Sequence, residues 1–288
     1  MTMLSADKTE NELFRSAVLK TVWAVENTHR FEVELQTALD NAQTDPPFTT
    51  RQEYHSEFRG FSIKIATIRP VPAMWGLTLG DIVNTFYSAF DNLAWALVCR
   101  GKTPPSTLSE AQQRGVYFPI CSSNALFNKS IPRYLPGVKR GDIAKVRRAQ
   151  PYAIGEKVVA RHCLTTLQKL SNADKHRSIQ PVWLRPDANW HQVVNARDCL
   201  VGRIRDMRPN TLKVDIELAR VYAKKTGLDP DIALQGYVAT SVTIDDELWL
   251  PNFMKTLREF AIQTMLGFVD GEYVISLIKA EGLSTEEI

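Results

Sequence analysis

The chain has 288 residues, of which 44% are hydrophobic and 23% are charged, and its formal net charge is +3 at pH 7. These values are typical of a soluble globular protein with a sizeable core, in one large domain or two modest ones. The charge is too small to indicate nucleic-acid binding by itself.

The cysteines and the apolar segments predict the cellular location. Cys99, Cys121, Cys163 and Cys199 are widely spaced without a Cys-x-x-Cys pair, which favours a reducing cytosol over a disulfide framework or a zinc site. Residues 1–11 are polar and lack the pattern of a signal peptide. The longest apolar stretch, residues 82–99, contains two asparagines and an aspartate and is too short to cross a bilayer. We therefore expect a cytoplasmic protein that does not enter a membrane.

The first hundred residues contain two predicted helices and a hairpin. Apolar residues recur at helical spacing over residues 10–41, and Asp45-Pro46-Pro47 ends that helix. Near-alternation over residues 51–68, with Arg59-Gly60 as a turn, predicts a β-hairpin. Asp81 is expected in the first turn of a buried helix that continues to Cys99, where a carboxylate suits the helix dipole.

The remainder predicts short helices, then a sheet, then closing helices. Residues 142–148 and 155–170 are expected to be helical. Turn signals separate four β-rich segments, which predicts an antiparallel meander over residues 179–184, 191–194, 212–221 and 232–244. A helix follows over residues 252–268, and a shorter one precedes the polar tail. The fold class is therefore α+β, with a mainly helical part over residues 1–177 and strands with closing helices over residues 178–288, forming one compact unit.

Four segments carry a resemblance to a known family. They are Gly80-Asp81-Ile-Val-Asn84-Thr-Phe-Tyr87-Ser88-Ala89-Phe90-Asp91-Asn92-Leu93-Ala94-Trp95, Phe118-Pro119-Ile120, Gln150-Pro151-Tyr152 and Asn172-Ala173-Asp174-Lys175-His176-Arg177. In this order they resemble an uncharacterised bacterial protein family whose helix reads roughly Gly-Asp-x-x-His-Asn-Leu-Arg-Ser-Ala-Leu-Asp-His-Leu-Ala-Trp and whose later motif is Asn-x-Asp-Lys-His-Arg. The resemblance covers about the first two thirds of the chain.

That family pattern is similar to the helical HEPN superfamily, many of whose members are ribonucleases. The resemblance implies a helical bundle in which an arginine and a histidine on one helix cleave RNA. The matching positions here are Tyr87 and Asn92, and an upstream histidine is replaced by Asn84. The catalytic pair is therefore not carried over to this chain, and the resemblance implies a non-catalytic scaffold.

Asp91 is a carboxylate on an otherwise apolar helix, and an unpaired buried charge is very costly. Lys175, His176 and Arg177 are its candidate partners, and Arg177 is able to hold it in a bidentate pair. The pairing is either a structural ion pair between two helices or an acid–base cluster.

His176 has an imidazole that exchanges protons near neutral pH. With Asp174 or Asp91 to orient it, and with Arg177 and Lys175 to bind phosphate, it has the components of a metal-independent ribonuclease. The alternative is a helix-terminal histidine bonded to the backbone. His162, beside Cys163, is expected on an exposed helix face rather than in a nucleophile pair.

The sequence has two clusters of basic residues. Each cluster is either a contact surface for a phosphate backbone or an ordinary solvent-exposed surface. The first cluster is Lys139, Arg140, Lys145, Arg147 and Arg148, and the second is Arg203, Arg205 and Arg208. No glycine-rich phosphate loop or metal-ligand spacing is present in the sequence, so neither a cofactor nor a metal is expected.

Three functions follow as hypotheses. The leading one is a non-catalytic, HEPN-like binding module with RNA or a protein as partner. The second is a metal-independent ribonuclease that uses His176 with Asp174 or Asp91 and with Arg177 and Lys175. The third is a small-molecule enzyme at the same cluster. The sequence is compatible with a homodimer and does not determine the oligomeric state.

Overall fold

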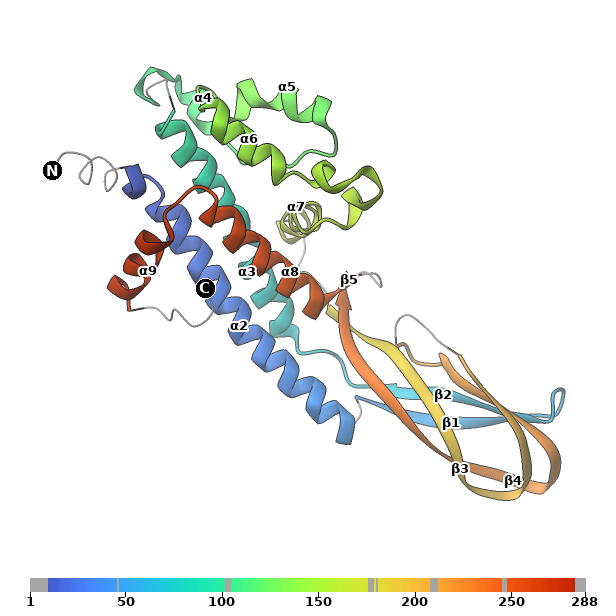
Figure 1. Cartoon of the computed structure of the whole chain (residues 1–288). Coiled ribbons are helices and arrows are strands. Elements are labelled where there is room, and N and C mark those ends of the chain that lie inside the picture. Colours follow the sequence, from blue (N-terminus) through green and yellow to red (C-terminus); the bar gives the residue numbers. More distant parts are fainter. Residues whose placement is uncertain are drawn as a thin grey trace. The chain divides into compact units, whose positions relative to one another are not determined.

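The computed structural model describes residues 10–45, 47–101, 105–175, 179, 181–207, 212–244 and 248–282. It contains helices and an antiparallel sheet, so the predicted α+β class is confirmed (Figure 1). The chain divides into two compact units. The helical unit comprises Met1–Phe31, Leu77–Ile179 and Asn252–Ile288, and the sheet unit comprises Glu32–Gly76 and Gln180–Pro251. Each unit is therefore assembled from segments that are far apart in the sequence.

The helical unit has an apolar core formed by three long helices and one shorter helix. Residues of α2 (Arg15–Thr44), α3 (Ala73–Cys99), α8 (Leu250–Leu266) and the shorter α9 (Gly271–Ala280) form this core. Their buried side chains include Val18, Val22, Ile82, Val83, Phe86, Leu93, Met254, Leu257 and Ile278, and Phe14, directly before α2, is also buried. Removal of these apolar surfaces from water is the main stabilising contribution to this bundle.

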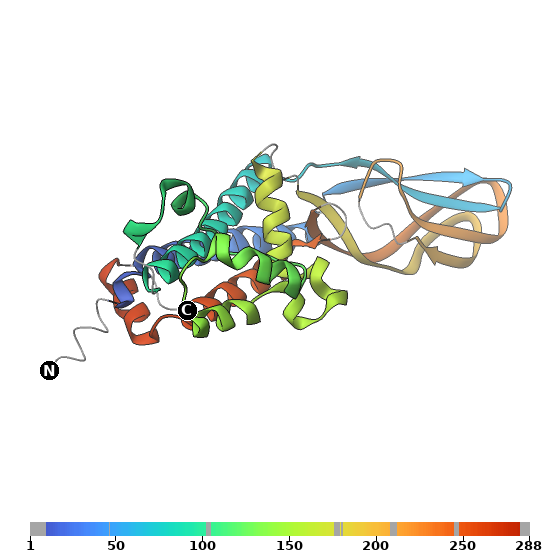
Figure 2. The ribbon, with the colours of Figure 1, turned by 90° about the horizontal axis from the view of Figure 1, so that it is seen from above.

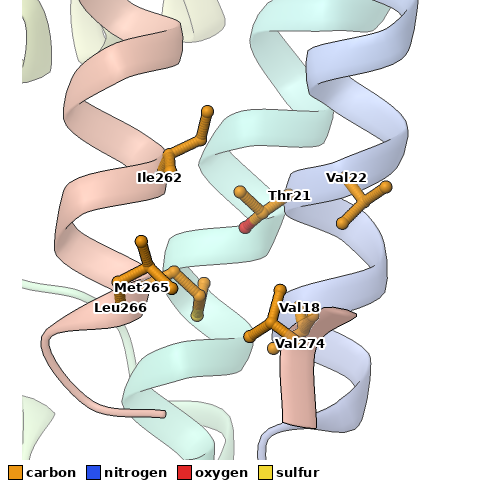
Figure 3. Close-up of a pocket in the computed structure, with 7 residues that line it drawn as sticks. All are labelled: Val18, Thr21, Val22, Ile262, Met265, Leu266 and Val274. Carbon is orange, nitrogen blue, oxygen red and sulfur yellow. The ribbon is translucent and has the colours of Figure 1, made fainter. Parts of the chain in front are cut away.

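A small apolar cavity lies among α2, α8 and α9 (Figure 3). Its volume is about 20 Å³, and its lining comprises Val18, Thr21, Val22, Ile262, Met265, Leu266 and Val274. The Thr21 hydroxyl donates to the carbonyl of Ala17, 2.9 Å away within its own helix. Because a buried water needs two or more polar partners, this space is a packing defect rather than a ligand site.

α3 begins eight residues earlier than the sequence predicts. It starts at Ala73, directly after Pro70-Val-Pro72, so Asp81 lies in the helix interior and not in the first turn. The prolines end the preceding strand but do not prevent the helix from starting after them, because helical hydrogen bonding excludes proline only from the helix interior. The prediction that Asp81 lies in the first turn and stabilises the helix dipole is therefore wrong.

The remaining helices of the helical unit are short. They are η1 (Pro105–Thr107), α4 (Glu110–Arg114), α5 (Asn124–Tyr134), α6 (Arg140–Arg148), η2 (Pro151–Ile154), η3 (Glu156–Arg161) and α7 (Cys163–Asp174). The single helix predicted over residues 155–170 is two elements, because His162 adopts an extended conformation and caps α7. Figure 2 shows α7 beside α3.

The sheet unit is antiparallel, with strand order β1-β2-β4-β3 and with β5 (Leu248–Trp249) paired to β4. The predicted hairpin is confirmed as β1 (Phe48–His55) and β2 (Gly60–Ile68), joined by a turn in which Arg59 has a φ of 47°. At Gly60 a Cβ atom would lie 2.0 Å from the carbonyl oxygen of Val221, so glycine is required where β2 meets β4.

The expected meander of short strands is wrong. β3 (Pro181–Asp206) and β4 (Glu217–Ile244) are two long strands that pair with each other over most of their length. Irregularities in register interrupt the pairing, including one between Leu184 and Asp187. Pro186 lies there, on an edge strand, and a bulge accommodates the missing N–H donor. At Pro186 the turn-like residues therefore mark a bulge rather than a strand end.

Candidate functional site

Two of the motif segments meet between α3 and α7. The side-chain amide of Asn84 donates to Oδ2 of Asp174 over 2.8 Å, and the Ser171 hydroxyl donates to Oδ1 of Asn84 over 2.8 Å. Gly80, one turn earlier on α3, provides the space for the carboxylate, because a Cβ there would lie 2.4 Å from Oδ1 of Asp174. Asp174 is thus held against the backbone of α3, and its role in this arrangement is to join two helices.

The segment at Phe118 is hydrogen-bonded to α3, and the segment at Gln150 is hydrogen-bonded to residues beside Phe118. The backbone N–H of Phe118 donates to Oδ1 of Asp91 over 3.0 Å. Gln150, which is fully buried, accepts from the N–H of Cys121 over 3.0 Å and donates to the carbonyl of Pro119 over 2.8 Å. All four segments of the resemblance therefore contribute to one hydrogen-bonded scaffold.

Asp91 is not held in the predicted ion pair with Lys175. Burial raises the pKa of its carboxyl to about 6, although the hydrogen bond from Phe118 and the charges of Lys175 and Lys20 act in the opposite direction. Lys175 is near enough to influence this pKa but forms no ion pair with Asp91, which corrects the expectation for this pair. His176 and Arg177, the other candidates, lie outside the described residues.

Tyr87 lies beside Asp91 on α3. Burial raises the pKa of its phenol, the negative charge of Asp91 adds to this effect, and a hydrogen bond with Gln168 opposes it. The ammonium of Lys175 lies 5.4 Å from the centre of the Tyr87 ring, within the range of a cation–π contact. A carboxyl, a phenol and an ammonium are therefore brought together here.

Asn92 and Ser88 of α3 are hydrogen-bonded to side chains of α2. The amide of Asn92 donates to the hydroxyl of Ser16 over 2.8 Å, and the ammonium of Lys20 donates to the hydroxyl of Ser88 over 2.5 Å. Asn84 and Asn92 are thus both used to join helices.

His162 corrects the expectation of an exposed position. It is 8% exposed, it accepts a hydrogen bond at Nδ1 from the N–H of Leu164 over 3.1 Å, and its ring lies edge-on to that of Phe260. Burial lowers the pKa of this imidazole and raises that of the Cys163 thiol to about 12. Both groups are therefore neutral near pH 7, and His162 functions as a helix cap.

Two cavities open beside this scaffold. The first, the α5–α7 pocket, has a volume of about 480 Å³ and is lined by Ile120, Cys121, Ser122, Leu126, Lys129, Ser130, Arg133, Tyr134, Val159, Thr165 and Gln168. The second, the α2–α3 groove, has a volume of about 510 Å³ and is lined by Lys20, Trp23, Asn27, Thr78, Asp81, Ile82, Asn84, Thr85 and Ser88. Gln168 connects the α5–α7 pocket to Tyr87.

The first basic cluster lies on and beside α6, and all five of its residues are exposed. Lys139 pairs with Glu10, Lys145 lies over Phe268, and Arg147 donates to the side chain of Asn128. Arg140 and Arg148 form no ion pair with a described residue, so their charges are available to a phosphate.

The second basic cluster belongs to the sheet unit. Arg203 and Arg205 are exposed on β3, and Arg208 lies outside the described residues.

Sequence reasoning missed a buried ion pair in the helical unit. Nη2 of Arg100 lies 2.8 Å from Oδ1 of Asp142, and the guanidinium lies 4.6 Å from the centre of the Phe14 ring. Oδ2 of Asp142 has no hydrogen-bond partner among the described residues. The sequence signals for this pair were Arg100 at the end of an apolar helix and Asp142 within a basic helix. These residues are 42 positions apart, so the sequence does not show that they meet.

Among the described residues, no group of three or more His, Cys, Asp or Glu side chains is arranged to hold a metal ion. In the same part of the chain, no single helix has the length and apolar character needed to span a membrane, although α8 and α9 meet that criterion when taken together as a bent pair.

Comparison of the chain with protein-family models, curated proteins and solved structures finds no match.

Proposed function

We propose that the helical unit is a non-catalytic, HEPN-like binding module whose partner is RNA. The observation that carries the proposal is the engagement of Asn84 and Asn92 in contacts between helices. These positions correspond to proton-transfer groups in the family that the sequence resembles. A side-chain amide neither gives nor takes a proton near neutral pH, so this helix provides no acid–base pair at these positions.

The exposed cations of α6 support RNA as the partner. Arg140 and Arg148 are exposed and have no ion-pair partner among the described residues. Contacts from such residues to phosphates release counterions, so binding depends strongly on salt and weakly on base sequence. A phosphate backbone therefore fits this face better than a partner that requires an apolar surface.

The test is the binding of a fluorescently labelled single-stranded RNA, followed by anisotropy over a range of salt concentrations with a chelator present. We expect binding without cleavage. The double substitution Arg140→Gln/Arg148→Gln should weaken binding and reduce the salt slope by about 1.4, since each single-strand phosphate contact contributes about 0.7.

A matched control removes the same charge elsewhere on the helical unit. Arg114 and Lys255 are exposed, and each forms an i,i+4 pair with a glutamate of its own helix. Arg114→Gln/Lys255→Gln should leave RNA binding close to that of the unchanged protein. If both double variants lose RNA affinity equally, the effect is one of overall charge and the α6 site is wrong. If the protein binds no RNA but captures a protein partner, RNA is not the partner.

A metal-independent ribonuclease is the second candidate, favoured by one observation. Asp91 has a pKa of about 6 and lies beside Tyr87 and near Lys175, so it exchanges a proton near neutral pH. This candidate requires RNA cleavage in the presence of a chelator. Asp91→Asn and His176→Ala should each abolish that cleavage while leaving RNA binding unchanged, and an absence of cleavage by the unchanged protein excludes it.

A further inference from the structure

The α5–α7 pocket has an uncompensated positive charge. Lys129 and Arg133 are four residues apart on α5, so they lie on the same face of the helix. Neither forms an ion pair with a described residue, and none of the described residues that line the pocket is acidic. Like charges at this spacing destabilise a helix by a few tenths of a kcal/mol, roughly the reverse of an i,i+4 ion pair. An anion in the pocket would remove that repulsion.

The geometry of the cations suits a phosphate group. The Arg133 guanidinium lies 5.4 Å from the centre of the Tyr134 ring, which restricts the orientation of its planar fork. Ser122 and Thr165 also line the pocket, and neither hydroxyl forms a hydrogen bond with a described residue. A fork, an ammonium and two hydroxyls match the several acceptor oxygens of a phosphate better than the two oxygens of a carboxylate.

The pocket also has an apolar wall, which indicates that the anion is attached to an organic body. The apolar wall is the apolar part of the lining, which consists of Ile120, Leu126, Val159 and the Tyr134 ring. The volume of about 480 Å³ is within the range of roughly 300–1,000 Å³ found for small-molecule sites and far exceeds the size of inorganic phosphate.

The floor of the pocket is held in place before any ligand arrives. Gln150 fixes the segment from Pro119 to Cys121 through the hydrogen bonds already described, and it also donates to the carbonyl of Val146 over 3.2 Å. Gln168 is restrained by its hydrogen bond with Tyr87. A site whose walls are already positioned loses less conformational entropy when it binds a ligand.

We propose that the α5–α7 pocket binds a small organic phosphate, with Lys129 and Arg133 on the phosphate group and the apolar wall against the organic body. This site is separate from the α6 residues to which RNA binding is assigned, and it adds a small-molecule ligand to the proposed function.

Isothermal titration calorimetry on the full chain tests this assignment with four probes: adenosine 5′-monophosphate, ribose 5-phosphate, adenosine and inorganic phosphate. We expect at least one of the two esters to bind with a Kd below about 1 mM, more tightly than adenosine or inorganic phosphate. Failure of both esters to bind, or inorganic phosphate binding as tightly as the esters, would overturn the proposal.

Variants locate the site. Lys129→Gln/Arg133→Gln should weaken ester binding at least about 10-fold, the loss that follows from removing charge-assisted hydrogen bonds. Thr165→Val, on the opposite helix, should weaken it less. Arg114→Gln/Lys255→Gln and Arg140→Gln/Arg148→Gln should bind the ester as the unchanged protein does. Because these side chains are exposed or half-buried, circular dichroism should confirm that all the variants are folded.

The RNA backbone presents the same phosphate chemistry, so a short RNA with a 5′-hydroxyl is titrated in parallel. If it displaces the ester and requires Lys129 and Arg133, the pocket is part of the RNA surface and the small-molecule assignment is wrong. If RNA binding fails altogether but ester binding persists, the proposed function is wrong and the pocket assignment stands.

Discussion

Replacement of Asp91 by asparagine tests the electrostatics of α3 directly. In the folded chain, burial raises the carboxyl pKa from 3.8 to about 6. The folded protein therefore binds this proton more tightly than the unfolded chain. The stability contributed by the protonated carboxyl is complete below about pH 4 and is lost as the pH rises through about 6.

The magnitude follows from the size of the shift. Each pKa unit is equivalent to about 1.4 kcal/mol of unfolding free energy. The rise of the carboxyl pKa from 3.8 to about 6 therefore corresponds to about 3 kcal/mol. Asparagine keeps an oxygen acceptor for the N–H of Phe118 and carries no charge at any pH. We therefore expect Asp91→Asn to have nearly unchanged stability at about pH 4 and to be more stable than the unchanged protein by up to about 3 kcal/mol at about pH 8.

Urea unfolding followed by the circular dichroism of the helices, at several pH values between these limits, gives the required difference. Subtracting the two proteins at each pH removes the contribution of every other titrating group. Asp81→Asn is the matched control, because Asp81 is exposed on the same helix and its replacement removes no buried charge. A difference between Asp91→Asn and the unchanged protein that is constant with pH, or that grows toward low pH, would refute the reasoning.

Three further predictions concern packing and ion pairs in the helical unit. Gly80→Ala should destabilise the protein by about 1–3 kcal/mol in urea unfolding, because the new Cβ meets the carboxylate, and Asp174→Ala in the same chain should remove most of that cost. Arg100→Met should cost about 3–5 kcal/mol, since it leaves Asp142 buried without its cation, whereas Arg100→Met with Asp142→Asn should cost much less. Val18→Ile should fill the cavity of Figure 3 and raise the Tm slightly, because a cavity of 20 Å³ corresponds to about 0.5 kcal/mol; a lower Tm would show that the space is not accessible to a methyl group.

The predictions that held from the sequence depend on local periodicity. The helical spacing of the first helix and the near-alternation of the hairpin both reflect interactions within a few residues. The wrong prediction of a meander arose where residues whose local preference is for a turn lie within a strand of the folded sheet. Pro186 was interpreted as a turn, but pairing with β4 continues on both sides of it as a bulge.

The candidate site could be predicted only in part. The order of the four motif segments indicated that they belong together, and their hydrogen bonds join them into one scaffold. Their partners were not predictable, because Asp174 accepts a hydrogen bond from Asn84 beside Gly80, and Asp91 accepts one from a backbone N–H that no side-chain pattern reveals.

The amino-acid sequence by itself determined the fold class and the absence of a histidine–arginine pair on α3, since both depend on residue identity and local spacing. The tertiary structure alone decided which polar side chains join helices and which face an open pocket. Lys129 and Arg133 resembled any pair of surface cations in the sequence. They became a candidate phosphate site only when α7 and the segment around Cys121 formed a cavity beside them, since such a site depends on distances between residues far apart in the chain.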